Sequence, residues 1–381
     1  MAFDVLMAVE GGAFASDELR VRGTRLGNAD AGLATEIAMG VLRRRGELDA
    51  AIDSVAGRPV ARMDREVAAA LRMGAYQALF LDRVPRYAAV SESVSLVRRS
   101  KKASAAGFVN AVLRRVRVLD RGGPGAVNLP PWLWRKWREG HGEQRALAIA
   151  ASALRPPGVW IRVPPGAETE AESLGAAPTE TPGCWRAAGE TGPFRIQDIG
   201  SQAIVPLLEV ESGMRVLDVA AAPGNKSAQI LEMPGVRLVA CDASRSRLSQ
   251  MRLNAARVLA DGAKGLPFGP VFDRVLLDAP CSGTGTIGRN PEIKWRVQPE
   301  DLVRHAARQR AMLRNALGLL KPGGRLVYST CSLEPEENED VVAAALEGLG
   351  DVYELERMER RIPGEDEGDG FFAAMLASRL R

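Results

Sequence analysis

Between residues 214 and 331, short apolar segments alternate with longer segments of helical periodicity. The predicted strands are 215–219, 236–241, 274–277 and 324–329. The predicted helices are 226–231, 245–259 and 299–320. Such alternation is typical of a mostly parallel sheet covered by helices on both faces, which places this part of the chain in the α/β class. The later apolar segment Gly370–Leu376 is expected to add an antiparallel strand at the edge of the sheet.

The first 120 residues have a different pattern, in which apolar residues recur at helical spacing and no strand-like alternation occurs. The predicted helices are 34–48, 65–81, 88–99 and 106–119. The Gly/Pro-rich stretch Arg121–Gly125 has the composition of a linker. We therefore expect a multi-domain chain. The expected domains are an all-α domain over 1–125, a linker and small α+β subdomain over 126–200, and an α/β domain over 201–381.

Basic residues are concentrated in the front of the chain. Residues 1–127 contain 20 Lys and Arg against 14 Asp and Glu, whereas the remainder contains 31 against 33. This asymmetry suggests a module that docks on a polyanion, although ordinary solvated helix faces would give the same counts. The candidate phosphate contacts lie between two predicted helices: Arg98, Arg99, Lys101 and Lys102.

Three tryptophans follow the linker, and basic residues lie among them. Trp132, Trp134 and Trp137 would suit base stacking, or they would pack one domain against another, which is the commoner role of such residues. The sequence leaves both interpretations open.

The chain has four cysteines without a C-x-x-C pair or zinc-like spacing, and only two histidines. We therefore expect reduced thiols in a cytoplasmic protein and no metal site. No segment resembles a signal peptide or a membrane span.

A small-residue loop, Leu217–Ser227, follows the first predicted strand, and Gly224 would let its backbone pass close to a ligand. Its spacing fits neither the dinucleotide fingerprint nor the phosphate-binding P-loop. Asp242 ends the second strand, where a carboxylate can bind both hydroxyls of a ribose. Asp261, further along, could reach an adenine amino group. Each acid alone is more often a turn or cap residue, but together they indicate an adenosine-type cofactor.

Two cysteines lie just past predicted strands, where ligand crevices form in open α/β sheets. Cys281 belongs to the stretch Asp278–Gly285, and Cys331 belongs to Tyr328–Ser332. The alternative is that both are small buried apolar residues, the role that we assign to Cys184 and Cys241.

These stretches resemble the motifs of RNA cytosine-5 methyltransferases. The matching segments are Asp218–Lys226, Asp278–Gly285, Ser329–Ser332, Gln197-Asp198 with Ser201, and Pro335–Asn338. The helical front resembles the NusB-like RNA-binding domain that marks the RsmB (Sun) branch, which methylates small-subunit ribosomal RNA. The resemblance covers nearly the whole chain. It implies a Rossmann-like class I methyltransferase domain that uses S-adenosylmethionine, and a monomer that acts on 16S ribosomal RNA.

The resemblance also implies residue roles. Cys331 would be the nucleophile, Cys281 would resolve the covalent intermediate, and Asp278 would contact the N3/N4 edge of cytosine. The residues that would hold S-adenosylmethionine are Ala220, Ala221, Ala222, Pro223, Gly224, Asn225, Lys226, Asp242, Asp261 and Asp278. Arg289 and Lys294, in the loop after Cys281, are candidate RNA contacts.

The chemistry explains why a thiol is needed. C5 of cytosine is a weak nucleophile, and a thiolate that adds at C6 converts the ring to an enamine that can take a methyl group. DNA cytosine-5 methyltransferases place the nucleophile in the Pro-Cys position, so chemistry alone leaves Cys281 open. Two other functions compete: an RNA-binding factor with a decayed methyltransferase domain, and methylation of a protein or small molecule.

Two positions depart from the family pattern. Asn225 stands where a second glycine is usual, which we interpret as tolerance of positive φ by asparagine. Pro164 stands where the family has an asparagine, so any role of that side chain is in doubt.

Overall fold

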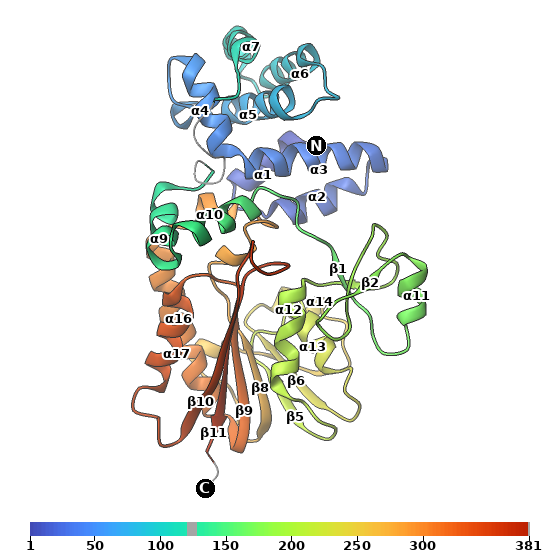
Figure 1. Cartoon of the computed structure of the whole chain (residues 1–381), viewed down its shortest axis with the longest axis vertical. Coiled ribbons are helices and arrows are strands. Elements are labelled where there is room, and N and C mark those ends of the chain that lie inside the picture. Colours follow the sequence, from blue (N-terminus) through green and yellow to red (C-terminus); the bar gives the residue numbers. More distant parts are fainter. Residues whose placement is uncertain (120–127, 380–381) are drawn as a thin grey trace. The chain divides into compact units, whose positions relative to one another are not determined.

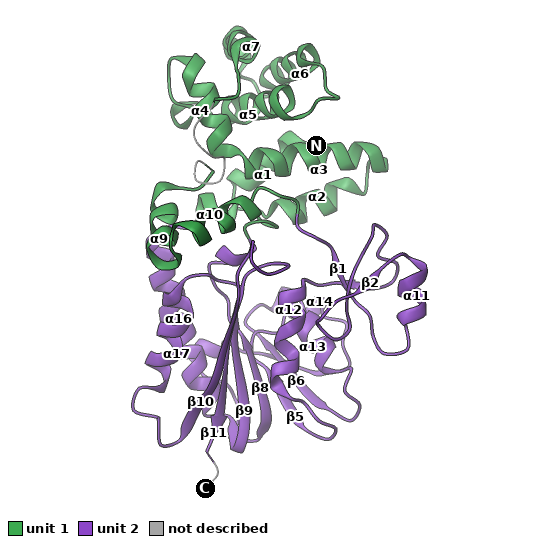
Figure 2. Cartoon of the chain, viewed as in Figure 1, with its two compact units in different colours: residues 1–156, 287–296 green, residues 157–286, 297–381 purple. Residues whose placement is uncertain are grey.

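The computed structural model describes residues 1–119 and 128–379 (Figure 1). These residues form two compact units, one of 1–156 with 287–296 and one of 157–286 with 297–381 (Figure 2). The predicted linker lies outside the described residues, and the three domain limits remain a prediction. Residues 128–156 belong to the first unit, whereas the expected α+β subdomain joined them to the segment that follows.

The first unit is helical. Its longer helices are α1 (Ala2–Glu10), α2 (Ala15–Gly23), α3 (Asn28–Arg43), α4 (Arg45–Ala56), α5 (Arg65–Phe80), α6 (Arg86–Arg99), α7 (Ala106–Arg115), α9 (Pro131–His141) and α10 (Glu143–Ser152). The predicted helix 34–48 crosses a break, because Arg44 leaves helical geometry at ψ 18° and separates α3 from α4. Helix α5 is central, with ten consecutive buried residues from Val67 to Tyr76.

Segment 287–296, which follows the Cys281 loop in sequence, belongs to this helical unit. Trp295 donates from Nε1 to Leu42 O at 3.0 Å, and the Lys294 ammonium donates to Arg43 O at 2.8 Å. Both acceptors lie at the carboxyl end of α3, where helix carbonyls lack intrahelical partners. Side chains of the segment therefore cap this helix.

Two further residues of the segment cap neighbouring helices in the same way. The Glu292 carboxylate accepts from Ala15 N, the first residue of α2, at 2.8 Å. The Arg296 guanidinium donates to Val9 O, near the end of α1, at 2.6 Å. A carboxylate at a helix amino end and a cation at a carboxyl end both complement the helix dipole.

The second unit is built on a seven-stranded sheet of order β10-β11-β9-β8-β5-β6-β7. Its strands are β5 (Arg215–Asp218), β6 (Arg237–Asp242), β7 (Ala256–Leu259), β8 (Phe272–Asp278), β9 (Leu320–Thr330), β10 (Tyr353–Arg361) and β11 (Phe371–Ser378). Strands β5 to β9 pair in parallel, and β10 and β11 are antiparallel. Buried residues of β5, β8 and β9 pack against α16 and α17 to form the main core. This sheet confirms the predicted Rossmann-like α/β class.

In the second unit, the later helices follow strands of the large sheet, whereas the first helices and a small sheet precede it. The helices are α11 (Glu168–Ser173), α12 (Ile199–Ile204), α13 (Asn225–Ile230), α14 (Arg245–Gln250), α16 (Pro299–Leu317) and α17 (Glu339–Leu346). The small antiparallel sheet has the order β2-β3-β1-β4, with β1 (Trp160–Arg162), β2 (Ala177–Pro178), β3 (Cys184–Arg186) and β4 (Arg195–Ile196). No helix of residues 1–119 and 128–379 is both long and apolar enough to cross a membrane.

Two sequence predictions are wrong in this unit. The predicted helix 245–259 ends at Gln250, and residues 256–259 form β7 because they pair in parallel with β6. Strand β11 is antiparallel as expected, but it is not the edge: β10 covers it. The charged, exposed β10 suits an edge, whereas the apolar and largely buried β11 suits an interior position.

The tight approach of α3 to α5 gives a test of the helical core. A Cβ added at Gly40 would lie 1.9 Å from Cζ of Tyr76, whereas one added at Gly32, in the same helix, would meet nothing within 4 Å. We expect Gly40→Ala to destabilise the unit by about 1–3 kcal/mol through overpacking. Gly32→Ala should be neutral or stabilise by up to about 1 kcal/mol through helix propensity. Hydrogen exchange of α3 and α5 in the full chain measures both, and equal protection in the two variants would contradict this packing.

Candidate active site

Four aspartates lie at the carboxyl ends of four neighbouring parallel strands. Asp278 ends β8, Asp218 ends β5, Asp242 ends β6, and Asp261 follows β7 by two residues. The strand order β8-β5-β6-β7 places all four along one edge of the sheet. This edge is where α/β sheets bind ligands. The sequence prediction named three of them and missed Asp218.

Asp218 is fully buried, and burial raises the pKa of its carboxyl to about 7. Its Oδ2 accepts from the Ser227 hydroxyl at 2.6 Å, which joins the end of β5 to helix α13. The signal for Asp218 was present in the sequence, because it lies near the carboxyl end of the predicted strand 215–219 and within the small-residue loop Leu217–Ser227.

The loop between β5 and α13 has the close-approach geometry that a cofactor cradle requires. Gly224 has φ 108°, a conformation that favours glycine, and an added Cβ would lie 3.1 Å from side-chain atoms of Leu253 and Met251. Asn225 is the first residue of α13 and does not have positive φ. Our interpretation of Asn225 was therefore wrong: the left-handed position is the glycine before it.

Asp242 joins this loop to the next strand. Its Oδ2 accepts from Ala222 N at 3.1 Å, and its Oδ1 accepts from Ser244 N at 2.7 Å and from the Arg247 guanidinium at 3.0 Å. The Arg247 side chain is 60% exposed. A ribose hydroxyl at Asp242 would therefore share or replace a bond to a solvent-accessible cation.

Asp261 has a similar environment. Its Oδ1 accepts from Ala263 N at 3.1 Å and from the Arg308 guanidinium at 2.7 Å. Arg308, in α16, is 41% exposed. Backbone N–H groups orient both carboxylates, and each carboxylate also binds a solvent-accessible arginine, an arrangement that fits a polar, hydroxyl-bearing ligand.

Asp278 is held on both of its oxygens. The Lys226 ammonium lies 2.7 Å from Oδ2, and the Ser329 hydroxyl donates to Oδ1 at 2.8 Å. Lys226 comes from the start of α13 and Ser329 from β9, so Asp278 connects that helix to the strand that leads into the Cys331 loop. Its side chain remains 31% exposed. Ser329 was part of a matched motif, but the sequence assigned it no role.

The two cysteines predicted to react meet in space. Strands β8 and β9 are parallel neighbours, and Asp278 pairs with Ser329 in register. The loops that follow these strands therefore leave the same edge, and the sulfurs of Cys281 and Cys331 lie 3.4 Å apart. A hydrogen bond with Cys331, followed by burial, raises the pKa of Cys281 well above its usual value.

Backbone contacts hold these two loops together. Gly285 N donates to Cys331 O at 2.9 Å, and a Cβ at Gly285 would lie 2.4 Å from Gly370 O and 2.8 Å from Cys331 O. Only glycine fits this approach, which explains its place in the Cys281 motif.

The other two cysteines are buried, as expected. Cys184 lies in the small sheet and Cys241 in β6. Burial raises their pKa values to about 11 and about 12, respectively, so both stay protonated at neutral pH. Among residues 1–119 and 128–379, no group of three or more His, Cys, Asp or Glu side chains could hold a metal ion.

The candidate RNA contacts divide into exposed and buried residues. Arg98, Arg99 and Lys101 are exposed at and after the end of α6, and Lys102 is half-buried in an ion pair with Asp64 at 2.8 Å.

Lys294 contradicts its predicted role as an RNA contact. Its side chain is fully buried, donates to Arg43 O, and has its pKa lowered to about 7 by burial and by the charges of Arg43 and Arg44. Arg289, in the same segment, is half-buried.

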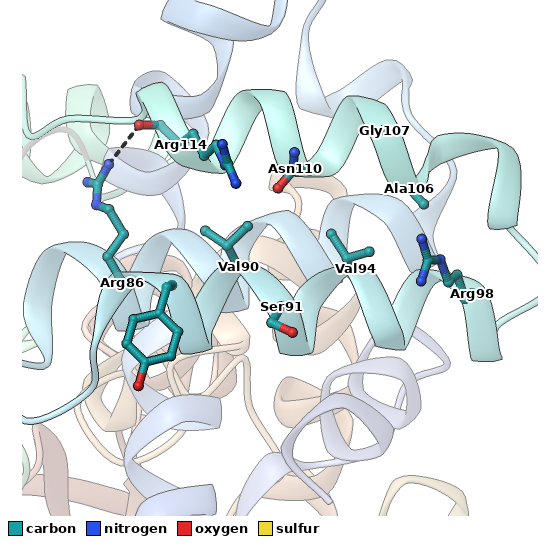
Figure 3. A pocket seen from close by; sticks show the side chains of 10 residues that line it. Arg86, Val90, Ser91, Val94, Arg98, Ala106, Gly107, Asn110 and Arg114 are labelled. Carbon is teal, nitrogen blue, oxygen red and sulfur yellow. Dashed lines mark hydrogen bonds between the residues drawn. The ribbon is translucent and has the colours of Figure 1, made fainter.

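Helices α6 and α7 border a groove of about 610 Å³ in the helical unit (Figure 3). Arg98 lies near one end of the groove and Arg114 near the other, with Asn110 between them (Figure 3). Arg86 is engaged, because its guanidinium donates to the carbonyls of Arg114 and Val116 at the end of α7. The floor contains apolar side chains from both helices, including Val90, Val94 and Ala106.

The tryptophans of α9 are mostly engaged in packing. Trp137 is buried, and Trp132 and Trp134 are half-buried. This placement favours packing over open base stacking.

Comparisons with known proteins agree with this geometry. Residues 205–377 match the family described as 16S rRNA methyltransferase RsmB/F, and residues 1–117 match the NusB family. The chain is 33% identical to ribosomal RNA small subunit methyltransferase B of Klebsiella pneumoniae, over 97% of this chain and 95% of that protein. It is 32% identical to the protein of the same name from Salmonella typhi, over 98% of this chain and 97% of that one.

Two solved structures share the fold. PH0851 superposes with a TM-score of 0.84 at 23% identity, over 98% of this chain and 97% of that one. A methyltransferase homologue from Pyrococcus horikoshii superposes with a TM-score of 0.56 at 28% identity, over 66% of this chain and 95% of that one. The row of aspartates at the strand ends, the paired cysteines and the similarity over nearly the whole chain lead to one conclusion: the chain belongs to the RsmB/F family of 16S rRNA methyltransferases, S-adenosylmethionine-dependent enzymes that act on RNA.

Proposed function

We propose that this enzyme methylates C5 of a cytosine in 16S ribosomal RNA through a covalent bond between Cys331 and C6. The observation that carries the proposal is the 3.4 Å separation of two sulfurs beside Asp278, at the carboxyl edge of the sheet. Methylation of oxygen, or of an exocyclic amine, needs no thiol, whereas attack through C5 requires prior addition of a nucleophile at C6. The names of the relatives support ribosomal RNA as the substrate.

The side chains divide the chemistry among them. The Cys331 thiolate adds to C6, and a proton delivered through the Asp278 carboxyl, at the N3/N4 edge, neutralises the negative charge that develops on N3. Lys226 and Ser329 fix Asp278 on both oxygens, so its orientation does not depend on the substrate. Ala220–Lys226, Asp242 and Asp261 would hold S-adenosylmethionine, which would supply the methyl group to C5 and leave as S-adenosylhomocysteine. A base then removes the C5 proton, the C6–S bond breaks, and Cys331 leaves as the thiolate.

Cys281 is suited to assist the release. Its raised pKa keeps it protonated at neutral pH, so it can donate a hydrogen bond. Its sulfur lies within hydrogen-bonding distance of the Cys331 sulfur and can stabilise that sulfur as it departs. The resemblance to RNA cytosine-5 methyltransferases, in which the cysteine of the Thr-Cys motif attacks, assigns the attacking role to Cys331.

We further propose that the groove between α6 and α7 contacts the RNA backbone. Arg98 and Arg114 line the groove, and both are exposed to solvent. Arg99 and Lys101, which are also exposed, extend the positive charge to the end of α6 and beyond it. Positive charge along a groove supplies affinity for the RNA backbone without sequence specificity, which suits a docking module that does not contact the reacting base.

We also propose that the activity is cytoplasmic, because the proposed substrate is ribosomal RNA.

Trapping on RNA that contains 5-fluorocytosine tests the roles of the cysteines, because fluorine at C5 prevents proton removal and the adduct persists. We expect Cys331→Ala to abolish the adduct, and Cys281→Ala to retain it. Cys241→Ala, which removes a buried thiol from β6, is the matched control and should retain it as well. A gel shift under denaturing conditions measures the adduct. Loss of the adduct in Cys281→Ala but not in Cys331→Ala would reverse the roles of the two cysteines.

Bisulfite sequencing of 16S ribosomal RNA with and without the protein identifies the cytosine that is methylated.

Salt-dependent binding tests the groove. We expect Arg98→Ala with Arg114→Ala to weaken RNA binding about tenfold at low salt. The slope of log K against log salt should fall by about 1.4, roughly 0.7 for each phosphate that an arginine no longer neutralises. The control is Arg237→Ala, which removes an exposed arginine from the amino end of β6. An unchanged slope in the double variant would mean that the groove does not bind phosphates.

A further inference from the structure

Glu337 is a fully buried carboxylate at the end of the short helix η6 (Pro335–Glu337). Its carboxylate accepts from Ser282 N at 2.8 Å, from the Ser332 hydroxyl at 2.5 Å and from Gln309 Nε2 at 3.1 Å. The Ser282 hydroxyl donates to it as well. All four donors are uncharged groups. Four hydrogen bonds compensate the cost of burying the carboxylate and fix its position.

The two serines connect this carboxylate to both reactive loops. Ser282 directly follows Cys281, and Ser332 directly follows Cys331. A single side chain therefore fixes the residues next to both cysteines, across two loops that are 50 residues apart in the sequence. Their two hydroxyls also lie 3.2 Å from one another.

Gln309 extends this network to helix α16. Its amide donates to Pro280 O at 3.0 Å as well as to Glu337. The loop before Cys281 and the residue after it are thus held by two adjacent buried side chains. Side chains locked by such networks hold reacting atoms more accurately than loops do alone.

The negative charge of Glu337 also acts on the sulfur of Cys281. Its charge is one of the causes that raise the pKa of Cys281, after the hydrogen bond with Cys331, burial and the charge of Cys331. The titratable groups that interact with Cys281 are Cys331, Glu337 and Tyr328, and the Tyr328 hydroxyl donates to Glu337 O at 2.5 Å. None of these groups is a cation that would favour a thiolate at Cys281.

We propose that Glu337 is a positioning residue that holds the two cysteine loops at reacting distance. The proposal rests on the function proposed above, and it adds a residue that does not touch the cytosine. Neither the spacing nor the composition of the sequence could separate Glu337 from its neighbour Glu336, because only the fold shows which carboxylate points at the serines.

Ser332→Ala tests the positioning role, because it removes the hydroxyl bond between Glu337 and the Cys331 loop. We expect the rate of adduct formation on 5-fluorocytosine RNA and the kcat of methylation to fall about tenfold, as small misplacements of reacting groups do. The Kd for S-adenosylmethionine should stay within about twofold of wild type, because the cofactor loop is unchanged. Ser282→Ala keeps the backbone bond to Glu337, and we expect a loss in the same direction but smaller.

Glu337→Gln tests the charge. A glutamine can keep all four contacts, since its amide oxygen accepts from Ser282 N and Gln309 while its two N–H groups donate to the serine hydroxyls. Removal of the negative charge should shift the pH profile of Cys281 alkylation, followed by mass spectrometry, toward lower pH. Asp340→Asn removes an exposed carboxylate three residues away and should leave the profile unchanged.

The outcomes separate the two levels of the proposal. A wild-type protein that forms no adduct would overturn the proposed function and this inference together. If wild type forms the adduct, two results for Ser332→Ala would overturn the positioning role. One is a rate of adduct formation and a kcat within twofold of wild type. The other is a rise in the Kd for S-adenosylmethionine as large as the loss of rate. An unshifted Cys281 profile in Glu337→Gln overturns the effect of its charge.

Discussion

The parallel pairing of β8 with β9 is the constraint on which the active site depends. Parallel neighbours end at the same edge of a sheet, so the loops that follow them leave side by side even though about 50 residues separate them. The register of Asp278 opposite Ser329 then sets which side chains meet. The Asp278 carboxylate meets the Ser329 hydroxyl, and the two thiols follow, three residues after Asp278 and two residues after Ser329. A change of register by one residue would reverse the face of each side chain and separate these groups.

Much of the fold was predictable because the apolar pattern of a parallel sheet is strong. Strands β5, β6, β8 and β9 are buried on both faces and have continuous apolar sequences. Strand β7 was missed because its residues are mostly exposed and resemble the end of a helix. Strand β10 was missed because its charged sequence has no apolar face, and its pairing with β11 depends on a distant part of the chain.

The site was predictable where a residue type, a position and a motif agreed. Cys281, Cys331 and Asp278 meet these conditions, and the structure places them together. Glu337 acts through buried hydrogen bonds that no local pattern reveals. The prediction for Lys294 was wrong because a basic residue in a loop suggests a surface position. Tertiary packing instead buries its side chain at the carboxyl end of α3.

Segment 287–296 has a consequence for how this architecture can vary. The chain leaves the sheet-containing unit after Thr286, contributes ten residues to the helical unit and returns at Val297, so the two units are not joined by a single connection. Removal of the helical unit at its linker would leave Trp295 and the ammonium of Lys294 without the helix ends that accept their hydrogen bonds. Recombination that exchanges front domains between related proteins would need to exchange this segment as well. Segment 287–296 therefore matches one particular helical unit, and the sequences of the segment and of that unit have to change together during evolution.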